Sequence, residues 1–137
     1  MLPAQFERFA RLGDGIITTY IEAEDCRLVR ERADEALARH GRSLPGFPLC
    51  VYTTVRFEDD VRTAERRTGE FLAAYYGGGV HMRGTMGLGP PDAVIDALRR
   101  YAAAGVTDLC LRFVGDDQFQ QFERFTAEVL PALTSPA

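Results

Sequence analysis

The sequence has 137 residues, of which 46% are hydrophobic and 26% charged, and its formal net charge is −4. This length suffices for one compact domain, and the composition excludes a disordered or collagen-like chain. Acidic residues outnumber basic ones by 20 to 16 and no basic stripe is present, which argues against nucleic acid or an anionic membrane as a partner.

The N-terminal residues and the cysteines predict a cytoplasmic protein. The first seven residues do not combine a charged start with an apolar segment, and no stretch reaches the ~18 apolar residues of a membrane span. The three cysteines, Cys26, Cys50 and Cys110, have no C-x-x-C spacing. We expect them to be reduced and buried as small hydrophobic residues.

Turn residues and apolar periodicity divide the chain into alternating helices and strands. The first two predicted helices cover about Pro3–Leu12 and Glu24–His40. The third predicted helix begins at an aspartate cap, Asp59 or Asp60, and ends at the glycines at 77–79. The fourth begins at Pro90 and Pro91 and ends at Gly105. The fifth begins at another aspartate cap, Asp116 or Asp117, and ends at Pro131. Three β-branched or apolar runs are predicted as strands, at Ile16–Tyr20, Leu49–Val55 and Leu109–Val114.

Helical sequence separates each predicted strand from the next, which predicts parallel β-α-β units with right-handed crossovers. The near-continuous apolarity of Leu49–Val55 suggests that this strand is buried on both faces. A sheet of only three such strands leaves two edges unpaired. We therefore expect the chain to be part of a larger structure, or a protomer that completes its sheet with a partner.

Five segments of the sequence together resemble the C-terminal portion of the luciferase-like monooxygenase family. In chain order, these segments are Ala10–Ile16, Val55–Ala64, Gly87–Val94, Tyr101–Leu109 and Glu128–Leu133. The weight of the resemblance comes from their order and spacing, because no single motif is specific. One departure is Gly87–Val94, where the family has G-T-P-x-x-V.

The resemblance implies an α/β fold: a partial (β/α)₈ TIM barrel, with about three parallel β-α units that correspond to the last three of a barrel. Residues 1–137 then form a single domain, and the first five units of the barrel, which carry most catalytic polar residues in this family, are not represented. A whole barrel takes roughly 250 residues. The family's cofactor is FMN or a deazaflavin coenzyme, so the resemblance implies a flavin-type cofactor and a small organic substrate.

Arg112 is the one charge within the three predicted strand cores, and a buried guanidinium must be paired. It lies near the C-terminal end of its strand, where barrel enzymes place their active sites and often a phosphate. One interpretation is therefore an anion or cofactor-phosphate ligand, with Gly115 beside it. The alternatives are an internal ion pair with Asp14 or Asp108, or an arginine on the helix-facing side of the sheet.

A glycine-rich segment, about residues 77–89, is predicted to be a flexible insertion between two helices. Gly78, His81 and Arg83 in this segment are candidates for a lid over an active site, and an ordinary flexible loop is the alternative. No G-x-G-x-x-G directly follows a strand, and no spacing of cysteine, histidine and acidic residues predicts a metal site. Aromatic residues at helical spacing favour core or interface packing: Tyr75, Tyr76, Phe119, Phe122 and Phe125.

The leading functional hypothesis is a luciferase-like oxidoreductase or monooxygenase that uses a flavin or deazaflavin, with catalytic residues that the sequence does not identify. A second hypothesis is a non-catalytic α/β module that completes its sheet by homo-oligomerisation or with a separate N-terminal half. A third hypothesis, a small anion-binding regulatory domain, depends only on Arg112 and the glycine-rich segment.

Overall fold

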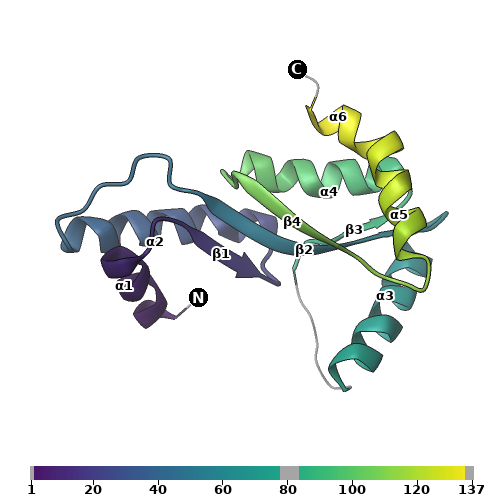
Figure 1. Cartoon of the computed structure of the whole chain (residues 1–137), viewed down its shortest axis with the longest axis horizontal. Helices are drawn as coiled ribbons and strands as arrows, with labels where there is room; N and C mark the ends of the chain where they lie inside the picture. Colours follow the sequence, from purple (N-terminus) through teal and green to yellow (C-terminus); the bar gives the residue numbers. More distant parts are fainter. Residues whose placement is uncertain (1, 78–83, 135–137) are drawn as a thin grey trace.

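The computed structural model describes residues 2–77 and 84–134 of the chain (Figure 1). The N-terminal half contains α1 (Pro3–Leu12), β1 (Ile16–Thr19), the 3₁₀ turn η1 (Ala23–Asp25), α2 (Cys26–Arg39), β2 (Leu49–Phe57) and α3 (Val61–Tyr76). The C-terminal half contains β3 (Gly87–Gly89), α4 (Pro91–Ala103), β4 (Asp108–Phe113), α5 (Gln118–Arg124), the π-helical turn η2 (Phe125–Val129) and α6 (Leu130–Thr134). None of the described helices is long and apolar enough to span a bilayer.

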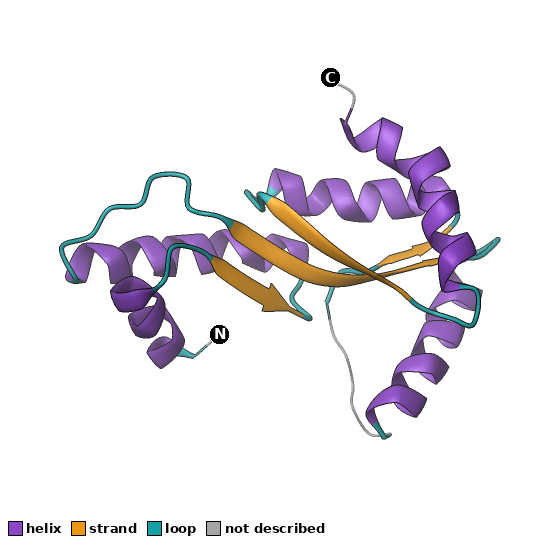
Figure 2. Cartoon of the chain, in the orientation of Figure 1, coloured by secondary structure: helices purple, strands orange, loops and turns teal. Residues whose placement is uncertain are grey.

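The sheet is parallel, and β2 is its central strand (Figure 2). β1 pairs with β2 from Ile16 opposite Leu49, and β4 pairs with β2 from Asp108 opposite Cys50. The order β1-β2-β4 is the order of consecutive strands in a (β/α)₈ barrel, and helices separate the strands along the chain. The predicted fold class, a partial barrel of three parallel β-α units, is therefore confirmed.

A fourth, short strand was not predicted. β3 lies within the segment expected to be irregular, and it pairs in parallel with the C-terminal end of β2. Val55 pairs with both Gly87 and Phe113, so β3 and β4 lie on opposite sides of β2. A strand of three residues that contains two glycines has almost no propensity signal, which explains why periodicity did not reveal it.

Two predicted boundaries were also wrong. β2 continues two residues past Val55, to Phe57, so Arg56 is a second arginine within a strand. The last helical region does not end at Pro131 but continues to Thr134, and the π turn η2 directly precedes α6. Pro131 is the second residue of α6, and its missing N–H interrupts the helical hydrogen-bond ladder directly after the π turn.

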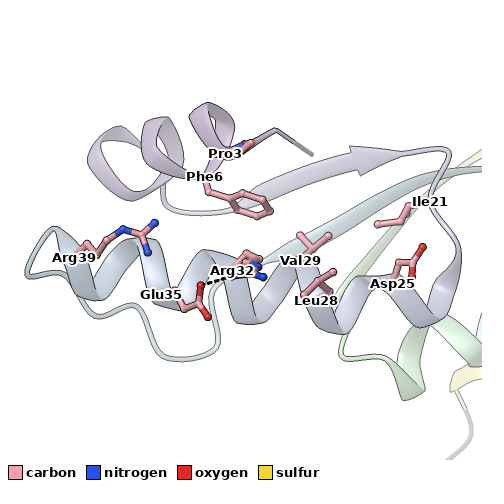
Figure 3. Close-up of a pocket in the computed structure, with 9 residues that line it drawn as sticks. All are labelled: Pro3, Phe6, Ile21, Asp25, Leu28, Val29, Arg32, Glu35 and Arg39. Atoms are coloured by element: carbon pink, nitrogen blue, oxygen red, sulfur yellow. Dashed lines mark hydrogen bonds and ion pairs between the residues drawn. The ribbon is translucent and has the colours of Figure 1, made fainter.

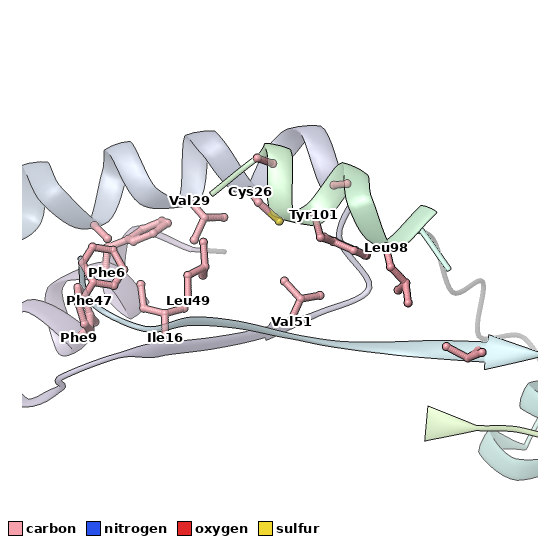
Figure 4. Packing of buried hydrophobic residues seen from close by; sticks show 14 of the residues in the cluster. Phe6, Phe9, Ile16, Cys26, Val29, Phe47, Leu49, Val51, Leu98 and Tyr101 are labelled. Atoms are coloured by element: carbon pink, nitrogen blue, oxygen red, sulfur yellow. The ribbon is translucent and has the colours of Figure 1, made fainter. Parts of the chain in front are cut away.

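One face of the sheet packs against α2 and α4. Side chains alternate between the two faces of a strand, and Leu49, Val51 and Val55 of β2 are completely buried on this face. Figure 4 shows Leu49 and Val51 below Val29 of α2 and residues of α4. Each fully buried aliphatic side chain of this kind contributes about 1.5–3 kcal/mol, so this layer holds the main hydrophobic core.

The opposite face of the sheet is largely uncovered. Ile17 on β1 is 68% exposed, and its partner Cys50 is half-buried. Cys110 on β4 is exposed, and Tyr52 opposite it is half-buried. The prediction of buried cysteines is therefore confirmed for Cys26 but wrong for Cys50 and Cys110. The predicted two-sided burial of β2 holds from Thr53 to Phe57 but not at Cys50 and Tyr52, because this face corresponds to the inside of a barrel whose other strands the chain does not contain.

The described end of the glycine-rich segment is firmly held. Thr85 is buried, its hydroxyl accepts a hydrogen bond from the Ala23 N–H (3.0 Å), and the same hydroxyl donates to Glu22 (2.9 Å). Its carbonyl accepts hydrogen bonds from the hydroxyls of Tyr101 (2.6 Å) and Thr53 (2.8 Å). Residue 85 thus joins the loop after β1, the central strand and α4. The lid candidates Gly78, His81 and Arg83 lie outside the described residues.

Candidate functional site

Arg112 lies on the uncovered face of the sheet, one residue before the end of β4. It is directly opposite Thr54 in the β2·β4 register, and Thr54 is buried. The alternative in which Arg112 lies on the helix-facing side is therefore wrong. Barrel enzymes carry their chemistry at the C-terminal ends of the strands, and Arg112 is at that end.

Three hydroxyl groups hold the Arg112 guanidinium. Nη1 donates to the hydroxyl of Tyr76 (2.9 Å), and Nη2 donates to the hydroxyl of Tyr20 (2.9 Å) and to Oγ1 of Thr54 (3.3 Å). The hydroxyls of Tyr20 and Tyr76 are themselves 3.2 Å apart. The loop after β1, the end of α3, β2 and β4 thus converge on one guanidinium.

Aromatic rings surround the same guanidinium. Cζ of Arg112 lies 5.4 Å from the ring centre of Tyr52, 5.6 Å from that of Tyr76 and 5.8 Å from that of Tyr75. All three distances are within the range of a cation–π attraction. We call Arg112 with Tyr20, Tyr52, Tyr75 and Tyr76 the tyrosine cluster.

The charge of Arg112 is not neutralised by a carboxylate. Within residues 2–77 and 84–134, no acidic side chain is in ion-pair contact with it, and its Nε is buried without a hydrogen-bond partner. The two carboxylates considered as partners are engaged elsewhere, because Asp14 pairs with Arg42 (3.2 Å) and Asp108 accepts from Thr107. The ion-pair alternatives are therefore wrong.

Arg56, the second arginine in a strand, shows the contrasting arrangement. Its Nε and Nη2 both lie 2.8 Å from Oε1 of Glu58, and its Nη1 donates to the carbonyl of Val114. Glu58 also binds Arg67. Arg56 is thus a compensated, structural arginine, whereas no carboxylate of the described residues pairs with Arg112.

Tyr20 has an unusual backbone conformation. Its φ is +52°, and it is the one non-glycine residue with positive φ in the described part of the chain. For a tyrosine this left-handed conformation costs about 1–2 kcal/mol, and such strained residues concentrate at functional sites. The conformation coincides with the hydrogen bond from Tyr20 to Arg112.

The two linked hydroxyls have pKa values shifted in opposite directions. Hydrogen bonds from Tyr20 and then from Arg112 hold the pKa of Tyr76 below its ordinary value. Partial burial and the hydrogen bond to Tyr76 raise the pKa of Tyr20. The hydrogen bond between the two hydroxyls, and one from Arg112 to each of them, thus link the ionisation of Tyr20 and Tyr76.

Gly115 follows β4 at the same end of the sheet. Its φ is +125°, and a Cβ at this position would lie 2.6 Å from Nη1 of Arg56 and 2.7 Å from Oδ1 of Asp117. Only glycine fits this position. The carboxylate of Asp117 does not cap the backbone of α5 as expected, but accepts a hydrogen bond from Gln121.

Sequence reasoning missed the tyrosines of the cluster. Tyr75 and Tyr76 were interpreted as packing residues, but Tyr75 is 67% exposed and Tyr76 is 40% exposed. Phe125 is in the core as expected, whereas Phe119 and Phe122 are exposed. A usable signal was present, because one tyrosine follows β1, another lies within β2, and two more end α3, the helix that comes after β2.

A cavity of about 580 Å³ lies elsewhere, between α1 and α2 (Figure 3). Pro3 and Phe6 line it from α1, and Leu28 and Val29 from α2. Its arginines are neutralised, since Arg32 binds Glu35 and Arg39 binds Glu7. The cavity lies among the covering helices, not at the strand ends, so the tyrosine cluster is the better candidate site. In the described part of the chain, no three histidine, cysteine or acidic side chains are grouped to hold a metal ion.

Comparison with solved structures gives matches over nearly the whole chain. One is a coenzyme F420 dependent tetrahydromethanopterin reductase from Methanopyrus kandleri, with 18% identity, a TM-score of 0.71 and coverage of 96% of this chain and 48% of that one. Another is an F420-dependent secondary alcohol dehydrogenase, with 13% identity, a TM-score of 0.77 and coverage of 97% and 47%. A third is the monooxygenase RslO1 from Streptomyces bottropensis, with 16% identity, a TM-score of 0.70 and coverage of 96% and 46%.

The fold is that of about half of each of these solved structures. The predicted likeness in fold to part of a barrel is confirmed, and the chain spans about half the length of the solved structures that it matches. No protein-family profile and no curated protein sequence matches the chain. At 13–18% identity the likeness establishes the fold, and the function must be argued from the site.

Proposed function

We propose that the chain forms the C-terminal half of a deazaflavin- or flavin-dependent oxidoreductase barrel that acts on a small organic substrate. The observation that supports this most directly is the uncompensated guanidinium of Arg112, held on the inner face of the barrel at the C-terminal ends of the strands. Flavin-type cofactors are anionic, so a fixed positive charge at this end suits them.

The site's residues fit such a cofactor. Arg112 would bind an anionic group of the cofactor, because among the described residues its buried Nε has no hydrogen-bond partner and its charge has no carboxylate partner. The backbone at Gly115 would provide a second contact at the same end. The cofactor would supply hydride transfer, and the protein would position it. We favour a deazaflavin over FMN, because two of the matched structures are described as F420-dependent.

Binding of the cofactor can be measured directly. The purified chain, in the assembly in which it is isolated, is titrated into coenzyme F420 and separately into FMN, and quenching of cofactor fluorescence is followed. Loss of a charge-assisted contact costs about 1.5–3 kcal/mol, so Arg112→Gln should weaken binding roughly 10- to 100-fold. Arg66→Gln is the matched control, because Arg66 is an exposed helix residue paired with Glu70.

Unchanged affinity in a folded Arg112→Gln variant would contradict the role of Arg112. No quenching of either cofactor by the wild-type chain would contradict the proposed function itself. Circular dichroism of both variants establishes that the fold is retained.

The open edges of the sheet favour a second candidate function, a half-barrel module that works by completing its sheet with another chain. In the described residues β1 and β4 each pair only with β2, so each has one free edge. An uncovered edge and an uncovered inner face both favour association. The partner would be a second copy of this chain or a separate half that supplies the first five β-α units.

The molar mass in solution distinguishes these partners. Light scattering during size-exclusion chromatography should show a dimer if two copies complete each other. Isolation of the chain from its own cells should instead show a second polypeptide if a separate half completes the barrel. A stable monomer that also binds no cofactor would contradict both candidate functions.

A further inference from the structure

We propose that Tyr76 is the proton donor of this site and that its substrate carries a carbonyl oxygen, as in a small ketone or aldehyde. Tyr20 and Arg112 act as positioning residues for its hydroxyl. This inference rests on the proposed function, since the hydride that accompanies the proton would come from a reduced deazaflavin or flavin.

The geometry isolates one hydroxyl as the group that can reach a substrate. Tyr76 is 40% exposed at the end of α3, and its hydroxyl accepts from Nη1 of Arg112 (2.9 Å) and lies 3.2 Å from the hydroxyl of Tyr20. Tyr20 is the more enclosed partner, and its hydroxyl already accepts from Nη2 of Arg112. A substrate on the inner face therefore meets Tyr76 first, with Tyr20 and Arg112 behind it.

The strained backbone of Tyr20 is an independent indication. Its φ of +52° directs a side chain from the loop after β1 to hydroxyls that belong to α3 and β4. A purely structural contact between these elements would not require a strained tyrosine, because Arg112 already joins α3 to β4 and β2. The strained conformation is explained if the site requires the Tyr20 hydroxyl at this position, next to the hydroxyl of Tyr76.

The charges around the pair favour loss of a proton from Tyr76. Among the described residues, the titratable or charged groups that face the guanidinium are Tyr20 from the β1 loop, Tyr52 from β2, and Tyr75 and Tyr76 from α3. None of them is a carboxylate. A phenolate on Tyr76 would thus be stabilised by the Arg112 cation and by a hydrogen bond from the Tyr20 hydroxyl.

The proposed step is balanced. The reduced cofactor, when bound, would supply a hydride with its two electrons to the carbonyl carbon as the C=O π bond breaks. The carbonyl oxygen takes the hydroxyl proton of Tyr76, which leaves an alcohol and the Tyr76 phenolate. Solvent then returns a proton to Tyr76. In the opposite direction, the phenolate takes the hydroxyl proton of an alcohol as its carbon gives up the hydride.

The first test needs neither cofactor nor substrate. Tyrosine ionisation is followed by ¹³C NMR of ring-labelled protein across a pH titration, and the Tyr76 signal is assigned by its loss in Tyr76→Phe. Tyr76 should ionise below the ordinary value of about 10, and Tyr20→Phe should raise that pKa. Tyr75→Phe is the control, since Tyr75 contacts Arg112 only through its ring. Ordinary ionisation of Tyr76, or no effect of Tyr20→Phe, would overturn the inference.

The second test measures turnover with acetone, cyclohexanone and benzaldehyde as carbonyl probes and reduced F420 as the hydride source. Tyr76→Phe should bind the cofactor as wild type does, lower kcat by about 100-fold or more, and abolish the alkaline limb of the pH profile. Arg66→Gln, at an exposed residue of the same helix outside the cluster, should change kcat less than about threefold. Normal turnover by Tyr76→Phe would overturn the role of Tyr76 as proton donor and would leave the proposed function standing.

Fluorescence quenching in the same samples separates the two claims. If wild-type protein does not quench F420, the proposed function fails and the catalytic role of Tyr76 fails with it. If the cofactor binds but no probe is reduced, the carbonyl assignment is overturned while cofactor binding stands.

Discussion

Arg112 and Tyr20 are 92 positions apart in the sequence, yet Nη2 of Arg112 lies 2.9 Å from the Tyr20 hydroxyl. The contact joins the last strand of the sheet to the loop after the first strand. It exists because parallel strands bring their C-terminal ends to one edge, whatever their separation along the chain.

Removal of the Tyr20 hydroxyl should destabilise the fold measurably. Tyr20→Phe deprives Nη2 of Arg112 of its shorter hydrogen bond and leaves the strained backbone in place, so we expect a loss of about 1 kcal/mol in urea unfolding. Tyr75→Phe should fall within about 0.5 kcal/mol of wild type, because the Tyr75 hydroxyl makes no hydrogen bond in the described residues. Equal effects of the two substitutions would argue against a specific role for the contact.

Substitution of Gly115 should be more costly than substitution of another glycine with positive φ. Gly115→Ala places a methyl group 2.6 Å from Nη1 of Arg56, whereas Gly41, with φ of +64°, has no atom within 4 Å of the equivalent position. Gly41→Ala should cost about 1–2 kcal/mol from its backbone alone. Gly115→Ala should cost more, because Arg56 must also move. Thermal unfolding of the two variants side by side tests the ranking, and a smaller loss for Gly115→Ala would refute it.

Thr85→Val should reveal how strongly the described end of the glycine-rich segment is held. Valine keeps the volume but leaves the buried N–H of Ala23 without its acceptor, which costs about 1–3 kcal/mol. Thr134→Val is the matched control, since Thr134 is exposed in α6. Denaturant unfolding gives both values. If the two variants were equally stable, the hydroxyl of Thr85 would not anchor the segment.

Tyr101 should make the protein sensitive to alkali. Burial raises the pKa of Tyr101 to about 12 from its ordinary value of 10. Because the folded pKa is the higher one, the stabilisation is complete below pH 10 and is lost as the pH rises from 10 towards 12, by about 2–3 kcal/mol. Unfolding free energies measured between pH 8 and 12 should show this fall.

Tyr101→Phe is the control for this alkaline effect. It should be less stable at neutral pH, because the carbonyls of Ile21 and Thr85 lose a donor, and its alkaline fall should be smaller. In Tyr101→Phe, part of the loss of stability should remain and should begin near pH 9, because burial also raises the pKa of Cys26 to about 11. An identical pH dependence in wild type and variant would show that Tyr101 does not ionise on unfolding.

The sequence by itself determined the elements and the general fold. Apolar periodicity located the helices, β-branched runs located β1, β2 and β4, and the alternation of the two predicted a parallel sheet. Capping chemistry was also readable, because Asp60 accepts the N–H of Thr63 at the start of α3 and Gly77 ends that helix with φ of +83°. These features depend on neighbours within a few positions, which is the range over which a sequence pattern carries information.

Only the tertiary structure decided the site. The sequence singled out Arg112 but not its face of the sheet, and it assigned Tyr75 and Tyr76 to packing. The orientation of Arg112 follows from its register opposite Thr54, and the cluster forms because three separate β-α units end at the same edge. Tyr20 reaches that edge through a backbone conformation that its residue type disfavours. Contacts of this kind depend on strand register and on strain supported by the whole fold, and no local pattern encodes either.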